Sequence, residues 1–499
     1  MTLAISDQLL LLGYPVNRIS KEVLEETMLK LIEGYVKDRR TRYATTVTAQ
    51  FLGQLAGLSL NHRIAPEIVA TLRQADFIGI DSKELQVLVK LLGNTIEDVI
   101  HPEDLLLSTS SLLGKYHQSI YILGVKEELC VEASKRLVED FPGLVISGIS
   151  CTPIFTKGLE LEESIQMDEV IIDAINEAAP TVLALHLGHP KQEIWLERVR
   201  TRLKVPLIIG VGGGFERYLA RREGSVPLSL SPSWTSIKRK LWSLLHYSLW
   251  IPPLLFYNSF NRLIYDLIYQ KVKNPSGHPH LFLSSKESLF ILPLPALIDR
   301  HTWEQHMNWI EAALEHENLI IDFSHVRHMN LEGMGVIYGI FQKIIQANKN
   351  LFLIGVNGDV RLLLKLHGAW DWISFFVVEG PADVLRKMSI NRGENLFKTK
   401  EFLSIDQLNE QTILSFFGRI QSCADTIPGG SQLNSVIQDR HLIINLQYCT
   451  SITNSGFGLL LNLRKYQKEQ KKSLMIKSVT PVVKNQFKYF KVDSHFNFI

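Results

Sequence analysis

The segment Leu187–Leu196 contains residue types that bind phosphates and sugars. It reads Leu-Gly-His-Pro-Lys-Gln-Glu-Ile-Trp-Leu and directly follows the apolar run Thr181–His186. Gly188 and Pro190 predict a tight turn, and Glu193 is expected to begin an amphipathic helix. The free backbone N–H groups at the start of such a helix favour an anion.

Two side chains of this segment add to its binding capacity. Lys191 contributes a positive charge, and the Gln192 amide can both donate and accept hydrogen bonds. The segment therefore suits a nucleoside diphosphate or a sugar hydroxyl. An ordinary strand-to-helix turn with an acidic residue at the helix start would have the same pattern, so the pattern alone does not decide between them.

The elements that would position this segment lie within residues 1–230, where short apolar runs alternate with helical patterns. Ser119–Gly124, Leu144–Gly148 and Val205–Gly210 are such runs, and Glu127–Phe141 and Glu163–Ala178 have apolar residues three or four positions apart. This alternation predicts parallel strands in an α/β layered fold. Several runs end in glycine, which would let a ligand approach the carboxyl edge of the sheet.

Composition limits the class of protein. The 499 residues are 46% apolar and 21% charged, which excludes a mainly disordered, collagen-like or disulfide-scaffold chain and suggests roughly three domains. The net charge of +2 gives no general indication of nucleic-acid binding. The four cysteines lack metal-ligand spacing and are expected to be reduced thiols in a cytosolic protein. The apolar run Leu9–Leu12 is too short for a signal peptide.

The Gly-x-Pro-Lys-Gln-Glu-x-Trp pattern at residues 188–195 resembles the signature of the WecG/TagA/CpsF glycosyltransferases. The surrounding sequence is similar to that family in the same order, over roughly residues 10–230. The similar segments are Thr46–Gln50, Ala75–Asp81, Tyr121–Gly124, Phe141–Gly148, Ile172–Pro180 and Ile209–Phe215. The resemblance implies a Rossmann-like parallel sheet.

The resemblance also implies an activity. The family transfers an N-acetylhexosamine-type sugar, often N-acetylmannosamine, from UDP to an undecaprenyl-diphosphate-linked acceptor, with no cofactor and no obligatory metal. By resemblance, Asp81 would be the catalytic base, Thr48 would contact the donor or the acceptor, and Gln192 would bind the donor. The other expected substrate-binding residues are Lys191, Glu193, Gly188, Gly124, Gly212, Gly213 and Gly214. The family often forms oligomers, so a homo-oligomer is also an expectation.

Several positions depart from the family pattern. The segment Glu97–Leu105 is acidic where the family has an arginine, and Phe215-Glu216 replaces a Phe-Asp pair. A lost cation would remove charge-assisted hydrogen bonds to a diphosphate. Asp81 can also be interpreted as a helix cap, because Asp81–Glu84 fits a capping box. His186 and His189 lack further ligands, so no metal site is expected.

Residues 233–273 have a different composition. Six basic residues accompany nine aromatic ones there, among them Lys238, Arg239, Lys240 and Trp242. A membrane span is disfavoured because the uncharged stretch 241–261 is interrupted by Pro252-Pro253 and by polar residues that include Ser243, His246, Ser248, Asn258 and Ser259. We expect an appendage that lies on an anionic membrane surface, with basic residues at the headgroups. A helical pair packed on the α/β domain is the alternative.

The remaining chain contains an internal repeat at an offset of 123 residues. Leu319–Ser324 matches Leu442–Gln447, and Asn330–Gly335 matches Thr453–Gly458 without a gap. Each copy predicts a strand, a glycine-containing loop, a helix and a strand. At about 110 residues, each copy is a domain, too long to be a solenoid repeat.

Both copies resemble the STAS fold, which presents a loop with a phosphorylatable serine at the start of a helix. In the second copy the matching residue is Ser455, and in the first it is Glu332, which would mimic a permanent partial phosphate. The alternative is a pair of docking modules in which these residues only cap helices.

The sequence therefore predicts four segments: a glycosyltransferase domain at 1–232, the appendage at 233–273, and STAS-like domains at 281–389 and 401–499. The leading hypothesis is a cytoplasmic transferase at the inner face of the plasma membrane, acting in bacterial polysaccharide assembly. Its expected partners are a UDP-sugar, a lipid-linked acceptor, the membrane and a protein bound by the STAS-like domains, with no nucleic acid. The second hypothesis is a catalytically degenerate scaffold that recruits partners.

Overall fold

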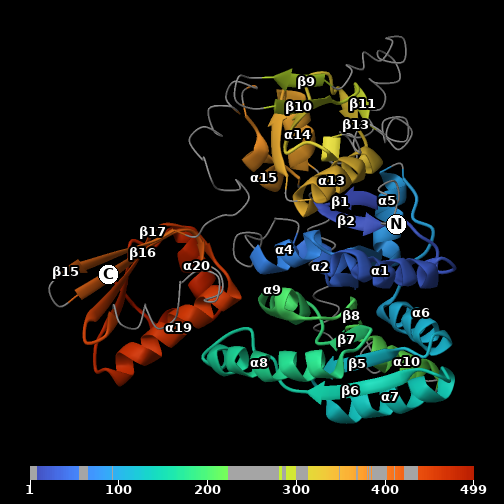
Figure 1. Cartoon of the computed structure of the whole chain (residues 1–499), viewed down its shortest axis with the longest axis horizontal. Coiled ribbons are helices and arrows are strands. Elements are labelled where there is room, and N and C mark those ends of the chain that lie inside the picture. The colour runs from blue at the N-terminus through green and yellow to red at the C-terminus, as the bar shows by residue number, and fades with distance from the viewer. Residues whose placement is uncertain are drawn as a thin grey trace.

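The computed structural model contains three α/β units (Figure 1). It describes residues 8–55, 66–92, 94–222, 280–283, 288–298, 313–347, 349–366, 369–378, 380, 384, 402–408, 411–420 and 437–499. The predicted appendage, with Lys238, Arg239, Lys240 and Trp242, lies outside the described residues, as do most of both predicted linkers. None of the described helices is long and apolar enough to cross a membrane.

The first unit is built on a six-stranded parallel sheet, as the alternating pattern predicted. The strand order is β4-β3-β8-β7-β5-β6, and every neighbouring pair is parallel. The strands are β3 (Arg42–Val47), β4 (Phe77–Ile80), β5 (Ser119–Gly124), β6 (Val145–Cys151), β7 (Val182–His186) and β8 (Leu207–Gly210).

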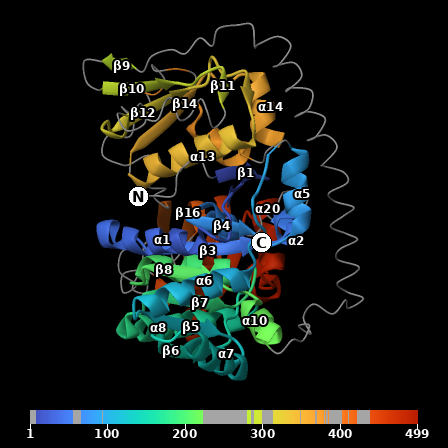
Figure 2. The same ribbon diagram turned by 90° about the vertical axis from the view of Figure 1, so that its right-hand side faces the viewer.

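Helices cover both faces of this sheet (Figures 1 and 2). Alternate residues of one strand belong to different hydrophobic cores: Leu183 and Leu185 to one, Ala184 to the other. Such double burial explains the continuous apolar runs in the sequence. The helices are α1 (Leu24–Asp38), α2 (Ala49–Leu55), α4 (Pro66–Arg73), α5 (Lys83–Leu91), α6 (Pro102–Lys115), α7 (Glu127–Asp140), α8 (Glu160–Ala178), α9 (Lys191–Val199) with the short η2 (Arg200–Arg202), and α10 (Gly214–Arg222).

A hairpin at the start of the described chain joins two cores. It consists of β1 (Gln8–Leu11) and β2 (Tyr14–Asn17), linked by a two-residue turn in which Leu12 and Gly13 both have positive φ. Leu9 is buried in the core of the first unit, and Leu10 is buried in the core of the second. Because successive side chains of a strand point to opposite faces, one short strand contributes to both.

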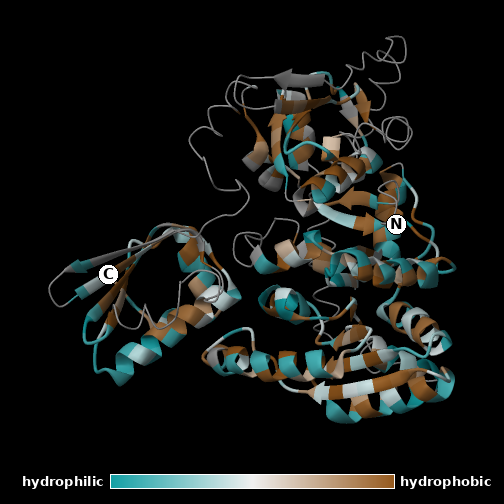
Figure 3. Ribbon diagram, viewed as in Figure 1, coloured by the Kyte–Doolittle hydropathy of each residue, from teal (hydrophilic) through white to brown (hydrophobic). Residues whose placement is uncertain are grey.

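The second unit is a four-stranded sheet of order β14-β12-β10-β9 with helices against it. Its interior strands are strongly apolar (Figure 3). The elements are β9 (His280–Leu283), β10 (Ser288–Pro293), β11 (Leu297–Ile298), β12 (Asn318–Asp322), β13 (His328–Met329), α13 (Leu331–Gln346), β14 (Asn350–Ile354), α14 (Gly358–Leu366), α15 (Trp370–Ile373) and η5 (Ser374–Phe376).

The third unit repeats the second, as the sequence offset predicted. Its elements are β15 (Phe402–Leu408), β16 (Gln411–Ile420), β17 (His441–Ile452), α19 (Asn454–Glu469), β18 (Leu474–Lys477), α20 (Pro481–Tyr489), η6 (Asp493–His495) and β19 (Asn497–Phe498). Adding 123 to the bounds of α13 and α14 gives the bounds of α19 and α20. The strand pairing is also repeated: β15 is antiparallel to β16, and β16, β17 and β18 are parallel, like β9, β10, β12 and β14.

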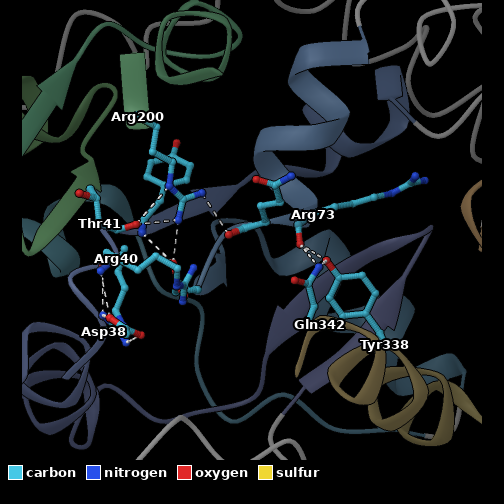
Figure 4. Close-up of polar contacts among 11 residues, drawn as sticks. Asp38, Arg40, Thr41, Arg73, Arg200, Tyr338 and Gln342 are labelled. Carbon is cyan, nitrogen blue, oxygen red and sulfur yellow. Dashed lines mark hydrogen bonds and ion pairs between the residues drawn. The ribbon is translucent and has the colours of Figure 1, made fainter. Parts of the chain in front are cut away.

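Helix α13 of the second unit packs on the first unit. A Cβ atom on Gly335 would overlap the carbonyl oxygen of Gln8, so the helix backbone lies directly against β1. The Tyr338 hydroxyl and the Gln342 amide both donate to the carbonyl of Arg73, at the end of α4 (Figure 4). Only glycine permits this close approach of helix and strand.

Helix α19 of the third unit packs on the first unit in a similar way. Arg198, on α9, donates to the Asn454 side chain at 2.7 Å, and Asn454 donates to the Thr156 carbonyl at 2.7 Å. Leu161 of α8 is buried in the core of the third unit. Both related helices therefore pack on the first unit, α19 through its first residue and α13 through residues from Gly335 to Gln342.

Candidate functional site

The carboxyl edge of the parallel sheet gathers the residues that the sequence singled out. Gly124 and His186 end β5 and β7, Thr48 directly follows β3, and Asp81 directly follows β4. Ligands of open α/β sheets bind outside this edge. The loop after β8, with Gly212, Gly213 and Gly214, borders the same edge.

The loop between β7 and α9 is held by His189. The His189–Pro190 peptide bond is cis, and Gly188 has a φ of 71°. His189 Nε2 is 2.8 Å from the Thr46 carbonyl oxygen and Nδ1 is 2.7 Å from Glu193 Oε1. Its ring stacks on Phe51 with 4.2 Å between centroids. These contacts fix the start of α9 to the end of β3.

Gln192 and Glu193 lie beneath this loop and are fully buried. Gln192 Nε2 donates to the Tyr43 hydroxyl at 3.0 Å and to Thr45 Oγ1 at 3.2 Å, and the Tyr43 hydroxyl donates to Glu193 Oε1 at 3.0 Å. Gln192 therefore binds the underside of the sheet edge, and its side chain is covered by protein. Helix α9 begins at Lys191, two residues before the predicted start, and Lys191 is exposed.

The electrostatics of this network favour a charged imidazole. Burial alone would lower the pKa of His189, but the negative charge and hydrogen bond of Glu193 raise it above its usual value. Burial, together with the Glu193 charge, also raises the pKa of Tyr43, so this phenol stays protonated and continues to donate.

Asp81 faces two cations or potential cations that the sequence analysis missed. Its Oδ1 contacts His101 Nδ1 and lies 3.3 Å from Nη1 of Arg217, while its Oδ2 lies 3.5 Å from Nη2. The carboxylate side chain is 5% exposed, and that of His101 is 37% exposed. The arrangement places one carboxylate, one imidazole and one guanidinium at the end of β4.

The interpretation of Asp81 as a helix cap is wrong. The N-cap of α5 is Ser82, whose Oγ accepts from the Leu85 N–H at 3.4 Å and from the Ala49 N–H at 3.3 Å. The capping residue is thus one position later than Asp–x–x–Glu spacing suggested. This leaves the Asp81 side chain to His101 and Arg217.

The remaining predicted residues line the edge in different ways. Thr48 Oγ1 accepts from the Phe51 N–H at 3.2 Å and so caps α2. A Cβ at Gly188, Gly212 or Gly213 would meet no atom within 4 Å, so these backbones face open space. At Gly124 a Cβ would overlap Cys130 Sγ, so packing requires glycine there.

His186 forms a further contact between an imidazole and a carboxylate at this edge. Its Nε2 is 2.9 Å from Glu216 Oε2, and its ring stacks on Phe215 at 5.0 Å between centroids. Burial would raise the pKa of Glu216, but His186 lowers it below the usual value. Within the residues that the structure describes, no group of three His, Cys, Asp or Glu side chains could hold a metal ion.

Asp81 and the loop of His189 lie on the same edge of the sheet. His189 is bonded to Thr46 on β3, and the Asp81 N–H donates to the Val47 carbonyl of the same strand at 2.9 Å. The Asp81 charge also contributes to raising the pKa of His189, after the larger effects of burial and Glu193. The Asp81 carboxylate and the loop that contains His189 are therefore both held by the end of β3.

The two positions proposed for regulation lie in the first turns of α13 and α19. Glu332 forms an ion pair with Arg18 of the first unit. Ser455 is half-buried, and its hydroxyl lies 2.9 Å from Thr453 Oγ1, which caps α19 by accepting from the Gly456 N–H at 3.1 Å. Both positions are thus close to contacts with the first unit.

Comparisons with known families agree with these units. Residues 9–227 match the model of the "Glycosyl transferase WecG/TagA/CpsF family", and residues 283–382 match that of the "STAS domain". The chain therefore contains one domain of each kind, which confirms both resemblances. The second STAS-like domain stays a prediction, which the structural repeat supports.

Three bacterial relatives are named "N-acetylglucosaminyldiphosphoundecaprenol N-acetyl-beta-D-mannosaminyltransferase". The protein of Bacillus spizizenii is 25% identical over 30% of this chain and 54% of its own length, so the chain spans about half of that relative. The protein of Bacillus subtilis is 20% identical over 40% and 75%. That of Staphylococcus aureus is 21% identical over 40% and 72%.

A solved structure, "Structure of the Bacillus Cell Fate Determinant SpoIIAA in the Phosphorylated Form", is 15% identical over 22% of this chain and 99% of its own. Its TM-score is 0.18, at which the likeness supports no conclusion.

Proposed function

We propose that the WecG/TagA/CpsF domain transfers an N-acetylhexosamine-type sugar, N-acetylmannosamine, from UDP to an undecaprenyl-diphosphate-linked acceptor. The observation that carries this proposal is the buried Asp81 carboxylate at the carboxyl edge, beside His101 and Arg217. The names of the relatives supply the sugar and the class of acceptor. Such a reaction belongs to bacterial surface or exopolysaccharide synthesis.

The chemistry needs two things at one place. The acceptor hydroxyl must lose a proton as it attacks the sugar, and the leaving UDP must be stabilised as its negative charge grows. In our proposal the deprotonation takes place at the group formed by Asp81 and its partners, and Thr48 contacts the sugar. The exposed Lys191 and the amides of Gly212 and Gly213 take the diphosphate charge, so that no cofactor beyond the donor is required. The predicted contact from the Gly214 amide is not kept, because this N–H donates to the Val211 carbonyl at 2.6 Å.

In this proposal the segment Pro190–Glu193 acts on the donor mainly by holding the loop before α9 in place. Because Gln192 and Glu193 are fully buried, they hold the loop that presents Gly188 and Lys191 to the donor. Gly124 lets α7 pack closely against the end of β5, because a Cβ atom there would overlap Cys130 Sγ. A substitution at these positions should change donor binding through the position of the loop.

The test is turnover of the full chain with UDP-N-acetylmannosamine and a lipid-linked N-acetylglucosamine acceptor analogue, followed by release of UDP. We expect Asp81→Asn to lower the rate by about 100-fold or more, the size of a lost acid–base group. Asp76→Asn is the matched control, since Asp76 is also buried beside an arginine, Arg200 at 3.0 Å, but precedes β4. If no UDP is released by the wild-type chain, or if Asp81→Asn keeps full turnover, the proposal fails.

We propose further that the chain works at the inner membrane surface through residues 233–273, whose basic residues would bind anionic headgroups. Lys238→Glu, Arg239→Glu and Lys240→Glu together should abolish flotation with anionic vesicles, since each basic residue near such a surface contributes about 1 kcal/mol. Retained flotation of this triple variant would contradict the assignment. Lys468→Glu, an exposed change on α19, is the control and should keep flotation.

The second candidate function is a scaffold that binds the sugar nucleotide without turnover. It is favoured by the way both STAS-like units pack on the transferase domain through the helix starts that contain Glu332 and Ser455. Phosphorylation of Ser455 would add charge beside Asn454, and a partner protein would bind the same helix. Calorimetry with UDP-sugar, followed by the turnover assay, separates binding alone from catalysis.

A further inference from the structure

The side chain that a substrate can reach at the end of β4 is His101. Its side chain is 37% exposed, whereas that of Asp81 behind it is 5% exposed. Arg217, whose Nη1 lies 2.9 Å from His101 Nδ1, has a side chain that is 23% exposed. An acceptor hydroxyl that approaches from solvent therefore meets the imidazole before it meets the carboxylate.

The carboxylate oxygens of Asp81 already accept hydrogen bonds from protein groups. Oδ1 contacts His101 Nδ1 and the Nη1 of Arg217, and Oδ2 is within 3.5 Å of Nη2. Together these contacts use three of the about four lone-pair sites of the carboxylate. Direct proton abstraction by Asp81 would therefore compete with groups that already hold both of its oxygens.

The tautomer of the His101 imidazole is assigned from its contact with Asp81. A ring nitrogen and a carboxylate oxygen can lie in contact only when a hydrogen lies between them, so Nδ1 carries the hydrogen. Arg217 Nη1, 2.9 Å from the same Nδ1, shares Oδ1 with it. In the neutral ring Nε2 then has a free lone pair, and it lies on the side away from the carboxylate.

The backbone holds His101 firmly in this position. It is the N-cap residue of α6, with φ of −83° and ψ of 158°, and Pro102 follows it at the first helical position. Its N–H donates to Asp104 Oδ2 at 2.7 Å, so the reciprocal bond of a capping box anchors the residue. A ring on such a fixed backbone loses little freedom when a substrate binds.

We propose that His101, and not Asp81, takes the proton of the acceptor hydroxyl, and that Asp81 and Arg217 act as positioning residues for it. This inference rests on the proposed transferase function. His101 Nε2 accepts the proton as the hydroxyl oxygen forms its bond to the anomeric carbon of the donor sugar. The bond from that carbon to the β-phosphate oxygen breaks, UDP leaves with the electron pair, and His101 later releases the proton to water.

The Asp81 carboxylate has a defined part in this step. The imidazolium that forms has its Nδ1–H directed at Oδ1, so the new positive charge lies against an existing negative one. Arg217 keeps the carboxylate from rotating towards solvent, because it binds both oxygens. No residue outside this group of three is needed to carry the proton.

The experiment measures UDP release by the full chain as wild type, His101→Asn, His101→Ala and Asp81→Asn. Asparagine keeps a good N-cap, so His101→Asn tests the ring without loss of the helix start. We expect kcat to fall by about 100-fold or more in all three variants, while KM for the donor stays within about threefold. His495→Asn, in η6 of the third unit, is the matched control and should keep the wild-type rate.

Added imidazole distinguishes the base from a structural group. It should restore part of the kcat of His101→Ala, where a space for the ring remains, and leave the kcat of Asp81→Asn unchanged. Rescue of the alanine variant supports the assignment. Full activity of His101→Asn, or failure of imidazole to raise the rate of His101→Ala, overturns it while the transferase function stands. A wild-type chain that releases no UDP overturns both.

Discussion

Glu193 is a fully buried carboxylate whose partners come from three elements. His189 approaches from the loop before α9, Tyr43 from β3, and Gln192 is its neighbour on the helix. A buried charge is tolerated only where it is paired and hydrogen-bonded. The network therefore fixes the position of the loop between β7 and α9 relative to the sheet, and with it the position of Lys191.

This pair gives folding stability a predictable pH dependence. The pKa of His189 is raised in the folded state, so its contribution is fully present below the unfolded-state pKa of histidine, about 6.5, and is lost as pH rises through the higher folded value. We expect the unfolding free energy of wild type minus that of His189→Gln to decrease across this interval. Urea unfolding at a series of pH values measures it.

The control for this prediction is His316→Gln, in the second unit, whose ring stacks on Phe290. Its difference from wild type should not follow the same curve. A constant difference for His189→Gln over the whole pH range would show that the charged form gains nothing from Glu193.

At the residue scale, the sequence identified the right segment but could not give the roles within it. The same Gln and Glu side chains satisfy a ligand or a buried network, and only the position of Tyr43 decides between them. His101 and Arg217 were missed because their contacts with Asp81 join positions 20 and 136 residues away. The nearest signals in the sequence were two departures from the family pattern. The segment Glu97–Leu105 contains His101, and the pair Phe215-Glu216 directly precedes Arg217.

Among the elements, α13 and β1 lie backbone against backbone where the second unit meets the first. Gly335→Ala would place a Cβ against the Gln8 carbonyl oxygen, which belongs to the backbone and cannot rotate away. We expect this change to weaken the packing of the second unit on the first by about 1–3 kcal/mol. Faster amide hydrogen exchange in β1, measured by mass spectrometry, is the readout.

Gly358→Ala, at the first position of α14, is the control because a Cβ there meets no atom within 4 Å. Gly458→Ala should be milder than Gly335→Ala, since its new methyl group would meet the flexible end of the Ile165 side chain. Unchanged exchange in β1 of Gly335→Ala would mean that the two backbones can separate at no cost.

At the element scale, prediction from the sequence was most successful where the chain repeats itself. The second and third units have the same helices at a constant offset of 123 residues, because the same apolar spacing and the same glycines recur in both. The hairpin β1–β2 was missed, since Leu9–Leu12 is an apolar run with no partner visible in the sequence. The two faces of β1 are buried in the cores of different units, so the hairpin can be predicted only once the arrangement of those units is known.

In the whole molecule, α9 connects the candidate site to the third unit. Its first residues hold the loop at the sheet edge, and Arg198 near its end pairs with Asp168 and donates to Asn454 of α19. Burial lowers the pKa of Arg198 below its usual value, against the opposing effect of Asp168. The guanidinium is nearly inaccessible to water, so the loss of any of its partners is costly.

Asn454→Ala should therefore weaken the packing of the third unit by about 2–3 kcal/mol, because it leaves the Thr156 carbonyl and one Arg198 N–H unsatisfied. The readout is hydrogen exchange of the Gly158 amide, which donates to the Phe490 carbonyl across this interface at 2.8 Å. Asn497→Ala, an exposed change in β19, is the control. Equal protection of Gly158 in both variants would contradict the prediction.

Residues of the transferase domain contact the first turns of both α13 and α19, Arg18 in one case and Arg198 in the other. Any foreign protein that recognises either turn must compete with this internal ligand. Such a protein binds only those molecules in which the STAS-like unit has separated from the transferase domain. Its apparent affinity for the intact chain is therefore its affinity for the isolated unit multiplied by that small fraction. Titrations on excised modules would thus overstate how tightly the complete protein is bound.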